Sequence, residues 1–415
     1  MLSDRHREIV RATVPVLQEH GETITKEFYS ELFEAHPELL NMFNTANQRD
    51  GNQARSLAAS ILSYAAHIDH LDAVGGMVDR IAHKHASLQV LPEHYPVVGH
   101  HLLNAIRTVL GDAATGEIIE AWAAAYEQLA GIMIGREGQL YAESAGQAGG
   151  WSGYKPFKVQ GKVRESSLIT SFYLVPADGS SLPPFQPGQY LGVLFEAPDG
   201  ERQQIRQYSL SCAPNSSYYR ISVKREYGPA GNLMIRPGVA SNYLHDRVKE
   251  GDILRVSMPF GDFVADETGA QPMVFITGGV GITPALSMLH HYAAKSVSRP
   301  LIFIHATQNG KEHAFRDEVN ELTARHAHIR KVVFYDQPLA EDLRGEHFDY
   351  SGRLSIEALQ SYLPDGPADF YYCGSLGFMC FVEGILDELN IPTERRHSEA
   401  FAPDPSFTQS AGSTK

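Results

Sequence analysis

Apolar residues recur at helical spacing through the first third of the chain. Two stripes show the pattern most clearly: Leu57, Ile61, Tyr64, Ala65 and Ile68, and then Val98, Leu102, Ala105, Ile106 and Val109. Residues three and four positions apart share one face of a helix, whereas alternation typical of strands is almost missing here. Residues 1–143 are therefore predicted to form an all-α domain.

The pattern changes after a stretch of small residues and glycines. Residues 144–153 are predicted to be a linker, because such composition gives no apolar face to bury. From 154 to 265, short apolar strands such as 188–193 and 219–223 alternate with turn residues, which predicts an antiparallel β-barrel. One helix is expected in this part, capped by Ser241.

Strands and helices alternate in the last part, residues 266–403. The order is a strand at Met273–Thr277, a helix from Pro284, and later strands at Leu301–His305 and Phe370–Cys373, the last followed by a helix. This order predicts an α/β domain with a parallel sheet. The polar tail, residues 404–415, is predicted to be disordered.

Composition agrees with a multidomain globular protein and narrows its partners. At 415 residues the chain exceeds one hydrophobic core, and its net charge of -14 disfavours nucleic acid and anionic membranes as partners. No run of about 18 apolar residues and no signal-peptide pattern occurs, so we expect a cytoplasmic protein that is not an integral membrane protein. The three cysteines, an odd number, favour reduced thiols.

His85 is the histidine whose position is most suggestive of a ligand. It shares a helical face with Val78, Ala82 and Leu88, whereas His83 falls on another side of the same helix. A histidine that points inward is either a metal ligand or a hydrogen-bonded core residue. The stripe alone leaves both readings open.

Three further polar residues lie on apolar stripes. Gln53 begins the face of Leu57, Tyr95 begins the face of Val98, and Glu137 shares a face with apolar residues of the last helix. A buried carboxylate is costly without partners, so Glu137 is either part of a site or a solvated residue near a helix end.

Together with these positions, short motifs carry a resemblance to a known family. They are Pro37-Glu38-Leu39-Leu40 with Asn41-Met42-Phe43-Asn44, then Asn47-Gln48-Arg49-Asp50-Gly51-Asn52-Gln53, and Lys84-His85-Ala86-Ser87. This part resembles the globin domain of the flavohaemoglobins of bacteria and yeast.

The resemblance implies a role for each of these side chains. His85 would be the proximal ligand of haem iron, Phe43 would pack against the porphyrin, and Lys84 would lie near a propionate and the flavin edge. On the distal side the family has the equivalents of Tyr29, Gln53 and Leu57. A phenol there could donate a hydrogen bond to the dioxygen ligand. Core packing for Tyr29 and plain solvent exposure for Gln53 and Lys84 are the alternatives.

The family also places Tyr95 and Glu137 beside the proximal imidazole. A carboxylate that accepts the second ring N–H makes a histidine ligand more electron-donating. This arrangement favours reactive iron over oxygen storage.

In such a protein, residues 154–403 would form the reductase, and they contain a pattern typical of flavin sites. In a strand, Arg206 and Tyr208 point to one side, and Gln207 and Ser209 point to the other. Tyr190, after Pro187-Gly188-Gln189, precedes this pattern as in ferredoxin-reductase-like domains. The arginine would supply a cation for the flavin pyrophosphate. A second contact to this pyrophosphate is expected from the backbone at the start of the predicted helix. These positions are Gly238, Val239, Ala240 and Ser241.

A glycine-rich turn follows the strand at 273–277. Glycines let a backbone approach a phosphate, Thr283 is placed to cap the next helix, and Pro284 suits its first turn. Pro284 also stands where a dinucleotide fingerprint would have its third glycine. The predicted nicotinamide-nucleotide contacts are Gly278, Gly279, Val280, Gly281, Ile282 and Thr283.

Two later stretches resemble the same reductases, namely 372–379 and 397–401. Cys373 would lie beside the nicotinamide, and Phe401 would stack on the flavin until the nicotinamide displaces it. Ser375 departs from the family, which usually has proline there. The expected contacts of this region are Cys373, Glu399, Ala400, Phe401, Ala402 and Pro403.

The resemblance predicts an oxidoreductase with haem b, FAD and NAD(P)H. Its expected reaction is nitric oxide dioxygenation, in which nitric oxide and dioxygen give nitrate, because a flavin can convert a hydride into single electrons for iron. Reduction of lipid or alkyl hydroperoxides, anaerobic reduction of nitric oxide, and an oxygen or nitric oxide sensor are the alternatives. We expect a monomer whose partners are dioxygen, nitric oxide and NAD(P)H, with room for a lipid in the distal pocket; the choice of NADH or NADPH stays open.

Overall fold

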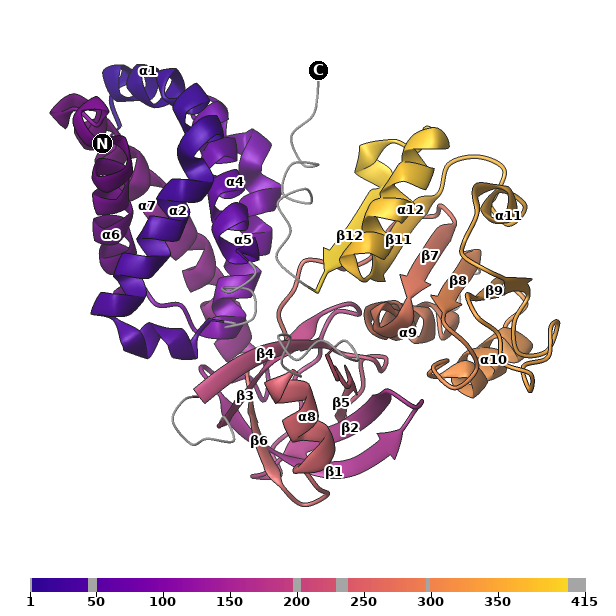
Figure 1. Ribbon diagram of the computed structural model, residues 1–415. Helices are drawn as coiled ribbons and strands as arrows, with labels where there is room; N and C mark the ends of the chain where they lie inside the picture. Colours follow the sequence, from indigo (N-terminus) through magenta and orange to yellow (C-terminus); the bar gives the residue numbers. More distant parts are fainter. Residues whose placement is uncertain (1, 44–50, 197–202, 229–237, 296–298, 402–415) are drawn as a thin grey trace. The chain divides into compact units, whose positions relative to one another are not determined.

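The computed structural model describes residues 2–43, 51–196, 203–228, 238–295 and 299–401 (Figure 1). The chain divides into two compact units, of which the first is built chiefly from Met1–Gly146 and the second from Gln147–Gly200 with Arg206–Phe401. The predicted disordered tail and the predicted contacts Ala402 and Pro403 lie outside the described residues, as do Asn44 of the first motif and residues 47–50 of the second.

The first unit is helical, as predicted. Its helices are α1 (Asp4–Ala12), α2 (Val14–Ala35), α4 (Asn52–Ala66), α5 (Gly75–Leu88), α6 (His94–Leu110) and α7 (Gly116–Gly146), with short 3-10 helices η1 (Pro37–Asn41), η2 (Leu71–Val74) and η3 (Gly111–Ala113). One core cluster joins α1, α2, α4, α6 and α7 through residues such as Phe28, Leu32, Tyr64 and Trp122. None of the helices in the described ranges combines the length and hydropathy that crossing a membrane requires.

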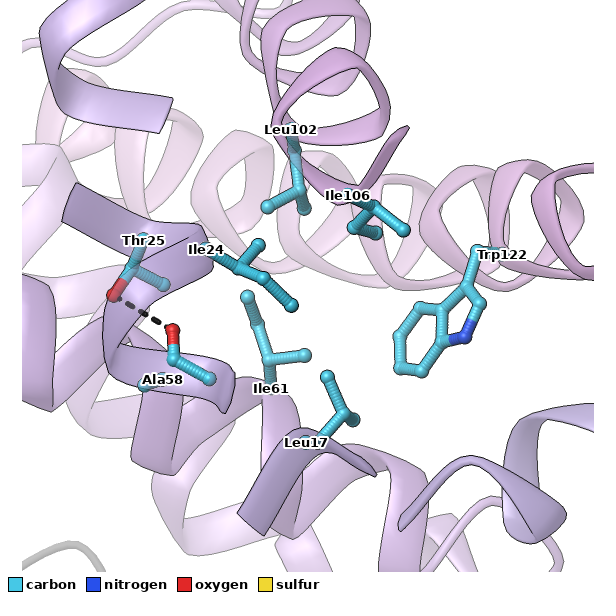
Figure 2. A pocket seen from close by; sticks show the side chains of 9 residues that line it. Leu17, Ile24, Thr25, Ala58, Ile61, Leu102, Ile106 and Trp122 are labelled. Atoms are coloured by element: carbon cyan, nitrogen blue, oxygen red, sulfur yellow. Dashed lines mark hydrogen bonds between the residues drawn. The ribbon is translucent and has the colours of Figure 1, made fainter. Parts of the chain in front are cut away.

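A small apolar pocket lies inside this helical core (Figure 2). Figure 2 shows Ile24 of α2, Ile61 of α4 and Trp122 of α7 facing it. Thr25 also lines the pocket, and its hydroxyl donates a hydrogen bond to the carbonyl of Ala54 at 2.8 Å. Gly21 also lines the pocket, and a Cβ at this position would meet the Cβ of Ala58 at 3.5 Å, an ordinary packing distance.

The second unit begins with six antiparallel strands. They are β1 (Lys155–Arg164), β2 (Ile169–Pro176), β3 (Tyr190–Glu196), β4 (Gln203–Ser209), β5 (Tyr219–Lys224) and β6 (Ile253–Val256), in the order β4-β3-β6-β1-β2-β5. A bridge between Leu210 and Ile221 links the end of β4 to β5 and closes the barrel. The interior is filled by side chains such as Phe157, Phe172 and Tyr219.

The rest of the second unit is a parallel sheet of six strands in the order β10-β9-β8-β7-β11-β12. Its strands are β7 (Met273–Gly278), β8 (Leu301–Thr307), β9 (Ile329–Tyr335), β10 (Tyr350–Ser351), β11 (Asp369–Gly374) and β12 (Arg396–Ala400). Its helices are α9 (Ile282–Ala293), α10 (Arg316–Arg325), α11 (Ile356–Gln360) and α12 (Leu376–Glu388), with 3-10 turns η4 (Gly279–Gly281) and η5 (Thr393–Arg395). The predicted fold class, all-α followed by an antiparallel barrel and a parallel α/β domain, is confirmed.

Two predicted helix starts are wrong. Helix α9 begins at Ile282 rather than Pro284, because η4 already winds the chain and Gly281 takes the cap position. The Thr283 hydroxyl instead donates to the carbonyl of Val280 at 3.0 Å. The barrel helix α8 (Val239–Asp246) begins before Ser241, and Gly238 is its cap.

We expect Gly21→Ala to raise the free energy of unfolding by about 1 kcal/mol, because alanine favours a helix interior over glycine and its methyl group enters the apolar pocket. Gly99→Ala is the matched control, since a Cβ at this position of α6 would lie 2.5 Å from the Tyr126 ring. That variant should lose about 1–3 kcal/mol through overpacking. Thermal unfolding of both variants measures the difference, and equal shifts of either sign would contradict this packing.

Candidate haem and flavin sites

The candidate iron ligand His85 lies on α5 and is bonded to two helices. Its Nδ1–H donates to Oε1 of Glu137 on α7, with 2.7 Å between the atoms, and Nδ1 lies 3.2 Å from the Tyr95 hydroxyl of α6. Tyr95 donates to the same carboxylate oxygen at 2.6 Å. The side chain of Glu137 is 2% exposed, whereas that of His85 is 32% exposed. The carboxylate thus occupies Nδ1 and leaves Nε2 as the nitrogen that can ligate iron.

Tyr95 is itself held in place by neighbours that the sequence did not reveal. Burial, then the hydrogen bond to Glu137, raises the pKa of Tyr95, so its phenol stays protonated and keeps donating. The Tyr126 hydroxyl donates to the backbone carbonyl of Tyr95 at 2.6 Å. Gly99 makes room for the Tyr126 ring. A glycine inside the amphipathic helix α6 was the signal that could have indicated this support.

The predicted distal residues lie on α2 and α4, and Phe43, predicted to pack against the porphyrin, lies in the turn after η1. Tyr29 contacts Phe43 edge-on, with 5.8 Å between ring centroids, and stacks on Phe33 at 5.6 Å. Burial raises the pKa of the Tyr29 phenol, and a hydrogen bond with Gln53 opposes this shift. Leu57 lies one turn after Gln53 on α4 and packs on the same core cluster as Tyr29.

Lys84, the remaining predicted residue of this unit, is exposed on α5 next to His85. The helix ends shortly afterwards at Leu88, and the next residue, Gln89, adopts a left-handed conformation with φ 59°. Lys84 was predicted to lie near a haem propionate and the edge of the flavin, and this stays a prediction.

In the second unit, β3 and β4 carry the predicted flavin residues. Tyr190 is buried, and its backbone pairs with Phe260 in both directions, at 2.7 and 2.9 Å. Gly188 before it has φ 104°, and any Cβ there would lie 1.9 Å from the Phe263 carbonyl. Glycine is therefore required at this turn.

The strand β4 places Arg206, Gln207, Tyr208 and Ser209 in sequence along the barrel. Burial lowers the pKa of Arg206 and raises the pKa of Tyr208. The Ser209 hydroxyl is buried and has no hydrogen-bond partner within the described ranges. Because buried hydroxyls are normally satisfied, this oxygen fits a site that takes a polar ligand such as a flavin.

The first turn of α8 is organised differently from the prediction. The Ser241 hydroxyl accepts from the backbone N–H of Glu226 and donates to the Gly238 carbonyl, both at 3.2 Å. Ser241 is thus the third residue of the helix and joins it to the chain after β5. The backbone N–H groups of Val239, Ala240 and Ser241 form the helix start, where an anion can bind.

The nucleotide turn lies where three parallel strands end side by side. Cys373 of β11 pairs in register with Thr277 of β7 and with Glu399 of β12. In open parallel sheets, ligands bind beyond these carboxyl ends. Gly281 passes so close that a Cβ there would lie 2.1 Å from the Cys373 carbonyl.

The residues beyond this edge follow the same layout. Gly278, Gly279 and Val280 connect β7 to α9, which begins at Ile282, and Ala400 ends β12. Phe401, the next residue, is 46% exposed, and its predicted place on the flavin ring stays a prediction. Burial raises the pKa of the Cys373 thiol, which disfavours the reactive thiolate, and its predicted place beside the nicotinamide stays a prediction.

Ser375, the departure from the family pattern, caps α12. Its hydroxyl accepts from the backbone N–H of Phe378 at 3.4 Å, and its φ is -66°. Serine therefore replaces the fixed φ of proline with a side-chain cap.

Comparison with known proteins agrees with this succession of folds. The Globin family model matches residues 26–133, and the Oxidoreductase NAD-binding domain model matches 275–384. The Flavohemoprotein of Deinococcus radiodurans is 57% identical over 407 residues, 98% of each chain, and that of Bacillus subtilis is 45% identical over 99% of this chain and 100% of the relative.

Solved structures show the same likeness. The flavohemoglobin of Malassezia yamatoensis, determined with bound FAD and heme, superposes with a TM-score of 0.83 at 31% identity, covering 97% of this chain and 100% of that one. The FAD/NAD binding domain of nitric oxide dioxygenase from Vibrio cholerae covers 60% of this chain and 99% of its own, with 38% identity and a TM-score of 0.53.

A globin followed by a flavin-type barrel and an NAD-binding domain defines a class of oxidoreductases that combine haem and flavin. With relatives this similar along nearly its whole length, the chain belongs to the flavohemoprotein family.

Replacing the buried carboxylate of Glu137 should make His85 a less electron-donating ligand of the iron. In Glu137→Gln the neutral amide accepts a weaker bond from His85, so the Fe–His stretching frequency of the ferrous haem should fall and haem-dependent turnover should drop by about 10- to 100-fold. Resonance Raman spectroscopy measures the frequency. Tyr141→Phe is the control, because the Tyr141 hydroxyl donates to Val90 and not to His85. An unchanged frequency in Glu137→Gln would argue against this role.

The two ways of starting α12 can be compared directly. Ser375→Ala removes the cap and should lose about 0.5–1 kcal/mol of unfolding free energy, whereas Ser375→Pro should be tolerated because the native φ already suits proline. Chemical denaturation of both variants is the measurement. A proline variant less stable than the alanine variant would contradict this account.

Proposed function

We propose that this chain is a nitric oxide dioxygenase, which converts nitric oxide and dioxygen to nitrate with electrons from NAD(P)H. The observation that carries the proposal is the hydrogen-bonded set of His85, Tyr95 and the buried Glu137 in a chain that also contains reductase folds. A carrier of oxygen needs neither an electron-donating ligand nor a source of electrons. The similar reductase domain from Vibrio cholerae belongs to a nitric oxide dioxygenase, which supports the same activity here.

The cofactors would supply the redox chemistry: haem iron binds a diatomic gas, and FAD divides the two electrons of a hydride into single electrons. The protein side chains would do the rest. His85 Nε2 would hold the iron, and its Nδ1 would donate to the buried carboxylate of Glu137, which orients the imidazole ring. Tyr29, with its raised pKa, keeps a proton to donate toward the distal ligand.

On the reductase side, the Ser209 hydroxyl, Arg206 and the start of α8 would bind the flavin and its phosphates. The Gly278–Gly281 turn at the sheet edge would approach the nucleotide through its backbone. Phe401 would cover the flavin ring and exclude water until the nicotinamide arrives. Each nitrate needs one electron, so two nitrate ions are expected for each NAD(P)H oxidised.

The direct test follows nitrate formation and NAD(P)H consumption by the purified holoprotein under oxygen with added nitric oxide. We expect His85→Ala to lose nitrate formation while NAD(P)H still reduces the flavin. His83→Ala, on the same helix, is the matched control and should keep the activity. A protein with full haem and flavin that forms no nitrate would rule the proposal out.

Reduction of hydroperoxides is the second candidate, because the same proton-accepting carboxylate behind His85 favours cleavage of an O–O bond. Turnover on alkyl hydroperoxide and on nitric oxide, measured with one preparation, ranks the two reactions.

A further inference from the structure

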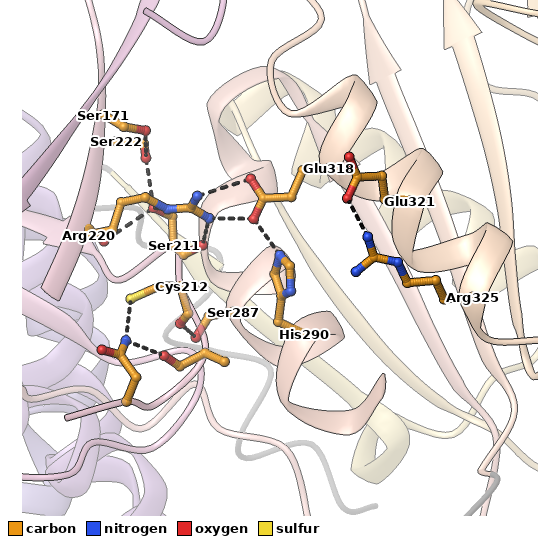
Figure 3. Close-up of polar contacts among 12 residues, drawn as sticks. Ser171, Ser211, Cys212, Arg220, Ser222, Ser287, His290, Glu318, Glu321 and Arg325 are labelled. Atoms are coloured by element: carbon orange, nitrogen blue, oxygen red, sulfur yellow. Dashed lines mark hydrogen bonds and ion pairs between the residues drawn. The ribbon is translucent and has the colours of Figure 1, made fainter. Parts of the chain in front are cut away.

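A partly buried charged network connects the barrel to the parallel-sheet part of the second unit (Figure 3). Arg220 lies on β5 of the barrel with a side chain that is 6% exposed. Its two terminal nitrogens donate to the two carboxylate oxygens of Glu318 on α10, at 3.0 and 2.8 Å. Figure 3 shows His290 of α9 reaching the same carboxylate.

The guanidinium is fixed on its barrel side as well. Its Nε donates to the Ser211 hydroxyl at 3.1 Å, and Ser211 is bonded in turn to Ser222 at 2.7 Å. The cation also lies over the ring of Phe315, 5.1 Å from the ring centroid. The N–H groups of the planar guanidinium therefore point at fixed acceptors on both sides. The compact ammonium group of a lysine could not reproduce this arrangement.

Glu318 is ionised throughout the working pH range. Burial alone would raise its pKa, but the hydrogen bonds from His290 and Arg220 lower it to about 2. A buried ion pair adds little net stability over an apolar pair of similar size. We therefore look for the role of the Arg220–Glu318 pair in how it orients the barrel and the helices α9 and α10.

The network holds the helix that carries the nucleotide turn. His290 lies near the end of α9, and Ser287 of the same helix donates to the Cys212 carbonyl at 2.6 Å. The start of α9 directly follows the Gly278–Gly281 turn. Two contacts along α9 and one on α10 thus fix this turn relative to the barrel, which carries the Arg206–Ser209 strand.

We propose that Arg220 and Glu318 are positioning residues for hydride transfer from the nicotinamide to the flavin. In that step C4 of NAD(P)H gives a hydride to the flavin, so the nicotinamide is oxidised by two electrons and the flavin is reduced by the same two. Neither residue touches the reacting atoms. They set the geometry between the nucleotide turn and the flavin strand, and misplacement by about 1 Å can cost about 10²-fold in rate.

The proposal rests on the reductase half of the proposed function, and its test needs neither iron chemistry nor nitric oxide. Full-length holoprotein is mixed rapidly with NAD(P)H without oxygen, and the bleaching of the flavin is followed. In Arg220→Lys and in the double variant Arg220→Met with Glu318→Met, the saturating rate constant should fall about tenfold or more. The NAD(P)H concentration at half-saturation, the FAD content and the melting temperature should stay near those of the parent.

The double variant removes both charges of the Arg220–Glu318 pair together, so neither is left without the other, and it therefore guards against simple unfolding. Arg325→Met is the matched control, because Arg325 pairs with Glu321 on the same helix α10 with side chains that are 72% and 65% exposed. It should transfer hydride at the parental rate.

Two results would overturn the positioning role. One is a parental rate constant in both Arg220 variants. The other is a loss of rate that only follows loss of FAD or of thermal stability. Absence of nitrate formation, in contrast, would reject the dioxygenase and leave this half-reaction interpretable.

Discussion

The buried carboxyl group of Glu137 constrains how three helices of the first unit meet. A carboxylate without hydrogen bonds inside a protein is strongly destabilising, so Glu137 must be served by donors from outside its own helix. His85 and Tyr95 meet this need, and α5, α6 and α7 consequently meet at a single oxygen atom. The orientation of the His85 ring is thereby set by the folding of the unit itself. A cofactor that binds through Nε2 would find its ligand already aimed.

In the second unit, positions around the expected nucleotide are set by glycines and by an ion pair. Where the nucleotide is expected, the structure removes side chains: Gly281 lies against the Cys373 carbonyl, and Gly278 lies against Phe378. Where the barrel meets the helices, it adds a rigid fork, Arg220 on Glu318. Close backbone approach gives room for a ligand, and directional hydrogen bonds give a fixed frame around it.

Much of this was predictable because the signals are local. The stripe through His85 placed its ring inward, and the change from helical to alternating periods separated the three folds. The starts of α8 and α9 were predicted wrongly because serine and threonine were taken as caps. In the structure the Ser241 hydroxyl accepts from the backbone N–H of Glu226, which is distant in sequence. The cap position of α9 is Gly281, which has no side chain to accept a hydrogen bond and ends the 3-10 turn Gly279–Gly281. Arg220 and Glu318 were missed for the same reason, since 98 positions separate them and no motif links the two.

The three cysteines have unequal surroundings. Cys212 and Cys373 are buried, and burial raises the pKa of each thiol, whereas Cys380 is exposed on α12. Maleimide chemistry on the native protein would therefore attach a fluorophore at one defined surface position without any cysteine removal. A dye there would report on the nucleotide-binding part alone, and single-molecule fluorescence could follow that part in the wild-type sequence.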